Sequence, residues 1–203
     1  MRKSKVETAE SRKRILATAK DIFLREGIAA TAISDVMVAA GLTQGGFYRH
    51  FESKEHLVAE ANAIALEESC AALAAAAAGK PPREAIDVIV FHYLHQLQEG
   101  PPGSLCPMAN LSSELRHADG HIKAVLSEGY ARLVKLFASY LMRLDYQDYV
   151  GLAESIVAVL VGAVSMSSMM PAGAAVEAIL TNAHNTVKLL LQNAPTSSAL
   201  ARP

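Results

Sequence analysis

The sequence contains no tryptophan, only two cysteines, and few aromatic residues, which make up 5% of its 203 residues. Two cysteines cannot form a disulfide framework for a chain of this size, and they favour reduced thiols in a cytoplasmic protein. The basic residues in segment 1–16 have no apolar core behind them, so we expect no signal peptide. Because 51% of the residues are hydrophobic, the chain can bury a sizeable core, and disorder is excluded as its general state.

The sequence also lacks an apolar run of the length that a membrane helix needs, about 20 residues. Residues 155–170, SIVAVLVGAVSMSSMM, are uncharged, but the run is shorter, rich in serine and followed by Pro171. We therefore expect no membrane contact. A helix that is apolar nearly all round must be buried on most sides. Its small residues would let a second helix approach closely, so we predict a homodimer interface here, with an ordinary core helix as the alternative; these residues are Ala158, Gly162 and Ser165.

Neither sign of charge dominates the chain, whose formal net charge is −1. The charge is nevertheless uneven, because the first 25 residues hold eight basic and three acidic side chains. A basic end of this kind points to contact with an anionic partner such as nucleic acid.

Apolar residues recur at helical spacing along nearly the whole chain, and no alternating run of strand length is convincing, so we predict an all-α fold. Thr31, Thr43 and Ser53 are expected N-caps, and glycine or proline marks most of the expected ends. Three helices form an N-terminal helix-turn-helix domain, residues 1–55, and a larger helical domain, residues 56–203, follows. The expected helices cover residues 11–26, 31–40, 44–50, 53–78, 83–99, 107–117, 120–143, 146–170 and 173–193, with a break at 100–104.

The segment GLTQGGFYRHFESKEHL, residues 41–57, places Gly45 and Gly46 inside an expected short helix. Glycine inside a helix costs about 1 kcal/mol relative to alanine, so another property must favour the pair. In a helix-turn-helix, the start of the second helix meets the base edges of the major groove. Glycines have no Cβ to hold the backbone away from DNA, so we interpret them as allowing close approach; a plain loop is the alternative.

The residues around these glycines fit a DNA-contacting helix. Tyr48, Arg49, His50 and Lys54 can donate hydrogen bonds to phosphates or bases. Phe47 and Phe51 lie four residues apart and are expected to pack this helix against its neighbours.

Residues 11–60 resemble the DNA-binding domain of TetR/AcrR-family transcriptional regulators. The resemblance depends on Phe23 with Gly27, on the turn AAGLT at 39–43, and on the block GGFYRHF at 45–51 followed by SKE at 53–55. It implies an all-helical homodimer that binds a palindromic double-stranded operator, with the last two long helices forming a dimeric four-helix bundle. It also implies a small-molecule effector in the C-terminal domain, and repression rather than activation.

The resemblance also implies which residues contact DNA. Ala32 departs from the family pattern, where a second Thr or Ser is common, and a backbone contact is expected to be missing there. Arg49 stands where an aromatic residue or His is usual, so it adds a possible base or phosphate contact. The residues taken as DNA-binding are Thr31, Thr43, Gln44, Gly45, Gly46, Tyr48, Arg49, His50 and Lys54.

Cys106, directly before Pro107, is the most distinctive residue of the C-terminal half. The segment 105–115 resembles that of a TetR subgroup with a cysteine at this point. A thiol at a helix N-terminus tends toward a lowered pKa, so Cys106 is a candidate for reaction with electrophiles or oxidants, with a buried, inert cysteine as the alternative. Cys70, in an alanine-rich helix, is expected to serve packing.

Several residues near the middle of this domain could line a small-molecule pocket, although the same mixture describes many cores. They are Phe91, Tyr93, Met108, Asn110 and Leu111, with His92 or His95 supplying polar contacts. The histidines and Cys106 show no compact metal-ligand spacing, and no third group orients a Cys–His pair. We therefore expect no metal, no cofactor, no catalytic residue and no enzymatic activity.

Two function classes remain open from the sequence. The first is a dimeric, cytoplasmic transcriptional regulator released from its operator by a small molecule or by cysteine modification. The second is an architectural or sequence-tolerant DNA-binding protein without an effector. A C-terminal domain of this size exceeds what dimerisation needs, which favours the first.

Overall fold

The computed structural model describes residues 5–99 and 106–197, and these are almost entirely helical. The expected break at 100–104 lies outside the described residues. The chain is all-α, as predicted, and α7 has the bounds expected from the sequence. The elements are α1 (Lys5–Glu26), α2 (Ile33–Ala39), the 3₁₀-helix η1 (Gln44–Arg49), α3 (Lys54–Ala76), α4 (Pro82–Glu99), α5 (Pro107–Asn110), α6 (Ser112–Leu115), α7 (Gly120–Arg143), α8 (Tyr149–Ser168) and α9 (Ala174–Asn193).

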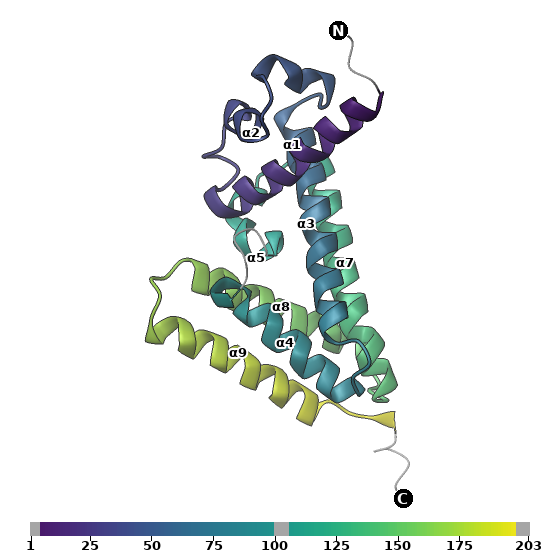
Figure 1. Ribbon diagram of the computed structural model, residues 1–203. Coiled ribbons are helices and arrows are strands. Elements are labelled where there is room, and N and C mark those ends of the chain that lie inside the picture. Colours follow the sequence, from purple (N-terminus) through teal and green to yellow (C-terminus); the bar gives the residue numbers. More distant parts are fainter. Residues whose placement is uncertain (1–4, 100–105, 198–203) are drawn as a thin grey trace, which may run out of the picture.

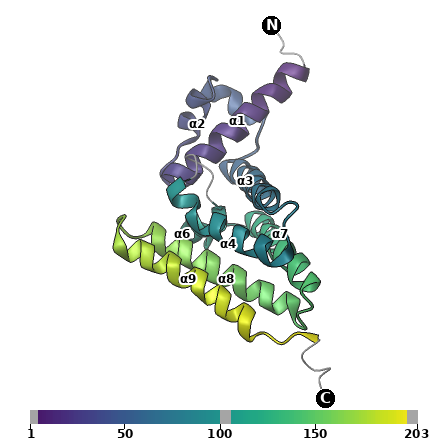
Figure 2. The same ribbon diagram turned by 60° about the horizontal axis from the view of Figure 1, so that its bottom comes forward.

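The helices form two groups joined by a long helical pair. In Figure 1, α1 and α2 lie at one end, α4, α8 and α9 lie at the other, and α3 and α7 run side by side between them. The α3–α7 pair approaches closely at Gly129, where a Cβ would lie 2.6 Å from Leu66 Cδ1. Helices α8 and α9 remain adjacent in the second view (Figure 2), so each supports the other along its length.

Two hydrophobic cores correspond to the two groups. The N-terminal core gathers buried side chains of α1, α2, η1 and the first half of α3, and it also takes Leu111, Leu115 and Ile122 from the C-terminal half. The C-terminal core is built from α4, α7, α8, α9 and the second half of α3, including Leu73. Because α3 contributes to both cores, the domain boundary at residue 55 stays a prediction.

The start of α3 and of α7 follows capping rules. Ser53 accepts a hydrogen bond from the His56 N–H at 3.1 Å, as expected. Asp119 accepts one from the Ile122 N–H at 2.9 Å. The turn before η1 needs Gly41, whose φ of +67° lies in the left-handed region that glycine adopts without strain.

The second helix begins later than expected, and Thr31 is not its N-cap. Ala32 takes the N-cap position, and its N–H donates to the Asp35 carboxylate at 3.0 Å. The Thr31 side chain is 2% exposed, and its hydroxyl donates to the Gly27 carbonyl at 2.6 Å. Thr31 therefore fixes the turn between α1 and α2, because its hydroxyl satisfies a backbone carbonyl instead of facing outward.

The single helix expected at 107–117 is wrong, since the chain there forms two short helices, α5 and α6. Leu111 lies between them with φ −111° and ψ 13°, outside the helical region. Ala109 packs in the C-terminal core, whereas Leu111 and Leu115 pack in the N-terminal core. One straight helix could not reach both cores, so the backbone turns at Leu111.

Among the described residues, α8 is a helix long and apolar enough to span a membrane by length and composition, and 44% of its apolar window is buried. A single such helix is weak evidence, because core helices pass the same test. Figures 1 and 2 show α8 flanked by α9 and α4. Packing inside the fold accounts for much of its apolar surface.

Candidate nucleic-acid interface and effector region

The η1 segment is anchored in the N-terminal core by two aromatic rings. Phe47 and Phe51 are buried, and their ring centroids lie 5.6 Å apart in a stacked arrangement. The sequence prediction that these two residues pack η1 against its neighbours is confirmed. The Arg12 guanidinium lies over the Phe51 ring, 4.8 Å from its centroid, so α1 covers this anchor.

The opposite face of η1 carries the side chains predicted to contact DNA. Tyr48 is 74% exposed, and its ring meets Phe47 edge-on with centroids 5.2 Å apart. This contact orients Tyr48 while leaving its hydroxyl available to solvent. The neighbouring Thr43, Gln44, Gly45 and Arg49 are exposed, and Gly46 and His50 are half-buried.

The two glycines have different surroundings. A Cβ on Gly45 would meet nothing within 4 Å, whereas one on Gly46 would lie 3.7 Å from Met37 Cε. Gly45 therefore leaves the exposed backbone bare, and Gly46 lies against α2. The expected α-helix at 44–50 is a 3₁₀-helix at 44–49, and the Thr43 side chain makes no capping hydrogen bond. Tighter winding is common in short segments of this length.

Lys54 lies at the edge of this face, but its ammonium has a partner within the chain. Lys54 Nζ donates to the Ile28 carbonyl at 2.6 Å, so it ties α3 to the loop after α1. The basic residues of α1 are also partly engaged, because Arg12 pairs with Glu60 and Lys20 with Glu68. Part of the positive charge counted in the first 25 residues is thus paired with carboxylates inside the N-terminal group of helices.

Cys106 is buried in the C-terminal core and is only 3% exposed. Burial raises the pKa of its thiol, and contact with the Tyr93 hydroxyl and backbone N–H groups opposes this only in part. The expected lowered pKa is therefore wrong: removal from water outweighs the helix N-terminus. Cys70 packs against the same core as expected, and burial raises the pKa of its thiol to about 11.

Tyr93 is the aromatic residue that the structure brings to Cys106. Its side chain is 1% exposed, and its hydroxyl meets the Cys106 thiol. The thiol beside it is a weak partner, so the pair is a buried polar site with unused hydrogen-bonding capacity.

The other residues of the expected pocket are dispersed. Phe91 and His92 lie on the exposed face of α4, where the Phe91 ring stacks on His95 with centroids 4.1 Å apart. Met108 packs partly buried against the C-terminal core. Asn110 donates through Nδ2 to the Leu24 carbonyl, so it joins α5 to α1. In the described part of the chain, no three His, Cys, Asp or Glu side chains gather as a metal site requires.

The three residues of the expected interface lie on one side of α8. Ala158 and Gly162 are exposed, and a Cβ on Gly162 would meet nothing within 4 Å. Ser165 is half-buried, and its hydroxyl donates to the Ala109 carbonyl at 2.9 Å. Ser165 therefore links α8 to α5 within one chain.

Glu114 is a contact residue that sequence reasoning missed. Its carboxylate accepts a hydrogen bond from the Ala29 N–H at 2.5 Å, although 85 positions separate the two residues. It also lies against Gly27, where a Cβ would be 2.8 Å from Glu114 Oε1. No local pattern marks such a residue, because the partner is a backbone group of a distant turn.

The geometry of α2, the Gly41 turn and η1 is that of a DNA-binding helix-turn-helix. The family described as "Bacterial regulatory proteins, tetR family" matches residues 15–61. Residues 15–61 are therefore a TetR-family DNA-binding domain, and the whole chain shares the fold of TetR-family transcriptional regulators. Regulators of this family are not enzymes, in agreement with the expectation from the sequence.

Two curated relatives each match part of the chain. The chain is 41% identical over 54 residues to the HTH-type transcriptional repressor BepR of Brucella suis biovar 1 (strain 1330), covering 27% of this chain and 26% of that protein. It is 39% identical over 59 residues to the HTH-type transcriptional regulator AcrR of Shigella flexneri, covering 29% and 27%. The match thus spans about a quarter of the length of these relatives.

Solved structures match nearly the whole chain in fold. A TetR transcriptional regulator from Chloroflexus aurantiacus J-10-FL is 28% identical with a TM-score of 0.73, covering 93% of this chain and 97% of that one. The reduced form of E. coli NemR is 21% identical with a TM-score of 0.77, covering 89% and 96%. The likeness therefore includes the C-terminal helices.

Proposed function

We propose that this protein is a cytoplasmic, homodimeric transcriptional repressor that binds a palindromic operator and is released from it by a small molecule. The observation that carries DNA binding is the division of η1 into two faces. Phe47 anchors one face in the core, and the other presents Thr43, Gln44, Tyr48 and Arg49 to solvent. A short helix held rigidly with donors outward is suited to the major groove. The name of BepR as a repressor favours repression.

Dimerisation follows from the outer face of α8 and α9. Ala158 and Gly162 are small and exposed in one protomer, and Met166 and Leu189 expose apolar surface on these helices. A second copy covering this face would remove that surface from water. Two η1 segments would then meet two half-sites one helical turn apart, about 34 Å on DNA.

The effector is proposed to occupy the C-terminal domain near Tyr93 and Cys106. The Tyr93 hydroxyl is buried against the Cys106 thiol, which is a weak hydrogen-bonding group, so a ligand with a stronger acceptor would satisfy the hydroxyl better. Helix α5, which begins beside Cys106, reaches α1 through Asn110 and α8 through Ala109. A ligand here could therefore change contacts of both domains. Modification of Cys106 is the alternative route to release. An architectural DNA-binding protein, the second function class, would have no effector site.

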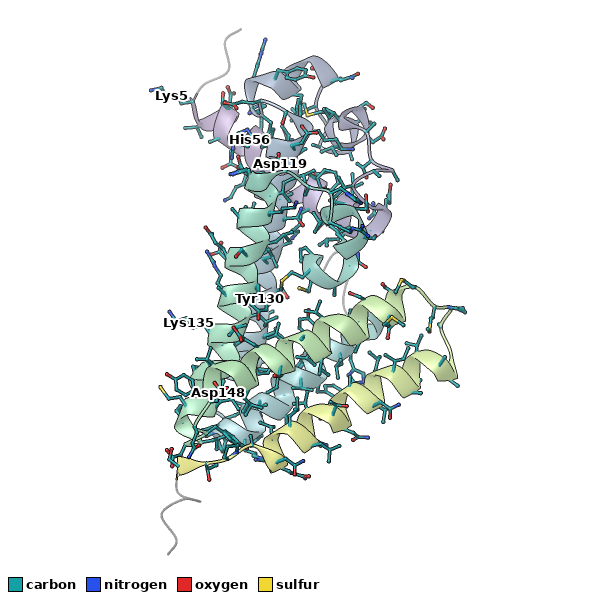
Figure 3. All side chains as sticks on the ribbon, turned by 180° about the vertical axis from the view of Figure 1, so that it is seen from behind. Lys5, His56, Asp119, Tyr130, Lys135 and Asp148 are labelled. Atoms are coloured by element: carbon teal, nitrogen blue, oxygen red, sulfur yellow. The ribbon has the colours of Figure 1, made fainter. Side chains whose placement is uncertain are left out.

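The test begins with selection of bound sequences from random duplex DNA, which gives the operator. Tyr48→Ala and Arg49→Ala are then compared with Tyr130→Ala and Lys135→Ala, whose side chains lie on α7, apart from η1 (Figure 3). The η1 variants are expected to lose affinity about tenfold while the α7 variants bind normally. If all four variants bind the operator as tightly as wild type, η1 does not contact the DNA. A ligand screen for release then separates the regulator from an architectural protein.

A further inference from the structure

Behind the aromatic anchor of η1 lies a small polar cluster made of Arg12 on α1 and of His56 and Glu60 on α3. Arg12 Nη2 and His56 Nε2 both meet the same carboxylate oxygen, Glu60 Oε1, the histidine at 2.7 Å. All three side chains are half-buried, and Figure 3 shows His56 in the N-terminal group of helices. Glu60 therefore holds two side chains at one point, one from each helix.

The His56 ring is oriented from both of its nitrogens. The backbone N–H of Glu52 donates to His56 Nδ1 at 3.4 Å, so in the neutral ring the proton lies on Nε2, which faces Glu60. The ring also meets Phe51 edge-on, with centroids 5.9 Å apart. His56 thus joins the turn between η1 and α3 to the Glu60 carboxylate and keeps that carboxylate in place.

Arg12 connects this cluster to the exposed side of η1. Its guanidinium lies over the Phe51 ring, 4.8 Å from the centroid, and Phe51 stacks on Phe47. Phe47 in turn meets the exposed Tyr48 ring edge-on. Contacts of these kinds depend on the relative orientation of the partners, so the position of the guanidinium affects each ring in the series. Glu60 is the carboxylate that fixes the guanidinium.

We propose that Glu60 is a positioning residue for operator binding, which acts through Arg12 and the two phenylalanine rings to hold Tyr48 in its DNA-contacting orientation. A carboxylate is repelled by phosphate, so Glu60 has no favourable contact of its own with the duplex. This inference rests on the proposed function, in which Tyr48 contacts the operator.

The direction of the change in affinity separates positioning from simple charge. Removing the Glu60 carboxylate takes a negative charge from the DNA-binding domain, and this alone strengthens attraction to DNA. Loss of positioning instead weakens operator binding. The two effects have opposite signs, so weaker binding by a Glu60 variant cannot come from its charge.

Lys20 and Glu68 supply a matched control on the same two helices. Their Nζ and Oε2 atoms lie 2.6 Å apart, and this pair spans 48 positions, as the Arg12–Glu60 pair does. In the described part of the chain, no aromatic ring lies under the Lys20 ammonium. Glu68→Ala therefore breaks an ion pair between α1 and α3 without disturbing the ring series.

Operator affinity is measured by anisotropy of a labelled duplex at fixed salt, and thermal unfolding is recorded for the same full-length proteins. We expect Glu60→Ala to weaken binding about fivefold, and Glu68→Ala to bind at least as tightly as wild type. Glu60→Gln removes the same charge but keeps an oxygen acceptor for Arg12, so it should recover most of the affinity. In a Tyr48→Ala background, Glu60→Ala should cost less than about twofold, because the side chain that it positions is absent.

Arg12→Lys is the second variant, and it serves if Glu60→Ala loses stability. It keeps the charge and can still pair with Glu60, but an ammonium does not lie flat on the Phe51 ring as a guanidinium does. Its operator affinity should also fall about fivefold. Because the charge is unchanged, no electrostatic correction is needed.

A further measurement needs no DNA. The protein is labelled with 3-fluorotyrosine, and the Tyr48 fluorine resonance is identified by its loss in Tyr48→Phe. This resonance should shift or broaden in Glu60→Ala and keep its position in Glu68→Ala, because only the first substitution frees Arg12.

The positioning role is overturned if Glu60→Ala and Arg12→Lys bind the operator as tightly as wild type, or if Glu68→Ala loses as much affinity as Glu60→Ala. It is also overturned if Glu60→Gln binds as weakly as Glu60→Ala, or if the Tyr48 resonance does not respond to Glu60→Ala. Full affinity of Tyr48→Ala would instead overturn the proposed DNA contact, and the positioning role with it. Failure of the inference alone therefore differs from failure of the proposed function.

Discussion

The Glu114 carboxylate holds the backbone N–H of Ala29 at 2.5 Å, across the boundary between the two groups of helices. A second contact, from Asn110 to the Leu24 carbonyl, lies beside it. The end of α1 is therefore held by α5, and the loop after α1 is held by α6 and by α3. A movement of α5 or α6 in response to an effector would reach the helix-turn-helix directly through these bonds.

Replacing Glu114 by alanine is expected to loosen this loop. The variant loses a charge-assisted hydrogen bond, and about 1 kcal/mol of the free energy of unfolding is expected to go with it. Hydrogen exchange at residues 27–31 should accelerate, whereas exchange in α9 should not change. Glu128→Ala, at an exposed position of α7, is the control. Glu114→Gln keeps a hydrogen-bond acceptor, so its exchange rate at residues 27–31 should lie between those of wild type and Glu114→Ala. If exchange is as slow in Glu114→Ala as in wild type, the bond does not restrain the loop.

Gly27 is expected to tolerate no side chain, for two separable reasons. Its φ is +91°, which costs a residue with a Cβ about 1–2 kcal/mol. The added Cβ would also lie 2.8 Å from Glu114 Oε1. Thermal unfolding should therefore show Gly27→Ala less stable by more than the backbone cost alone. In a double-mutant cycle with Glu114→Ala, the part due to the clash should disappear while the backbone part remains; strict additivity would contradict the clash.

The helix-turn-helix and most helix positions could be predicted because their signals are local. Ser53 caps α3 as a capping residue should, and Phe47 and Phe51 pack because a four-residue spacing puts them on one face. The spacing of apolar residues along α4 predicts that Tyr93 faces the core and that Phe91 faces solvent. Ile86, Ile89 and Tyr93 follow helical spacing, and all three are buried.

The remaining features depend on contacts between distant segments. The split of 107–117 arises because Ala109 and Leu111 enter different cores, and helical periodicity contains no information about a second core. The burial of Cys106 likewise reverses the pKa direction expected from its place before Pro107. Lys54 looks like a phosphate contact from its position, yet its ammonium is bound by the Ile28 carbonyl, 26 residues away.

The role of Gly45 can be tested by giving it a methyl group. No atom lies within 4 Å of a Cβ there, so Gly45→Ala should fold normally and gain up to about 1 kcal/mol in the free energy of unfolding. If the bare backbone lies against DNA, operator affinity should fall about tenfold in a gel-shift titration. Gly120→Ala, where a Cβ also meets open space, is the control and should bind as wild type. Unchanged affinity of Gly45→Ala would show that the backbone does not approach the duplex.

The proposed dimer interface predicts that Gly162→Asp separates the protomers without unfolding them. Gly162 is exposed within one chain, so the fold of a protomer has room for the new side chain. In a dimer the carboxylate would be buried without a partner, at a cost of several kcal/mol. Sedimentation should show a helical monomer, and operator affinity should collapse because two half-sites are no longer held together. Ala124→Asp, on the exposed side of α7, should remain dimeric; a dimeric Gly162→Asp protein would place the interface elsewhere.

The last prediction concerns the two thiols and the pH dependence of stability. Burial raises the pKa of Cys106 and sets that of Cys70 at about 11, against about 8.5 for a thiol in the unfolded chain. The folded state therefore keeps these protons while the unfolded state loses them. The thiols' contribution to stability is intact below pH 8.5 and decreases as the pH rises toward 11.

Reactivity follows the same pKa values, because the thiolate is the nucleophile. In folded Cys70→Ser, which retains Cys106, labelling by a thiol reagent at neutral pH should be far slower than in denaturant. In folded Cys106→Ser, the labelling rate of Cys70 should rise about tenfold per pH unit below 11. Fast labelling of Cys106 in the native dimer would contradict its burial. Release by cysteine modification would be favoured if labelling also weakened operator binding by wild type and by Cys70→Ser. Operator binding by Cys106→Ser should then be unaffected by the reagent. Slow labelling with intact operator binding leaves the non-covalent effector as the route to release.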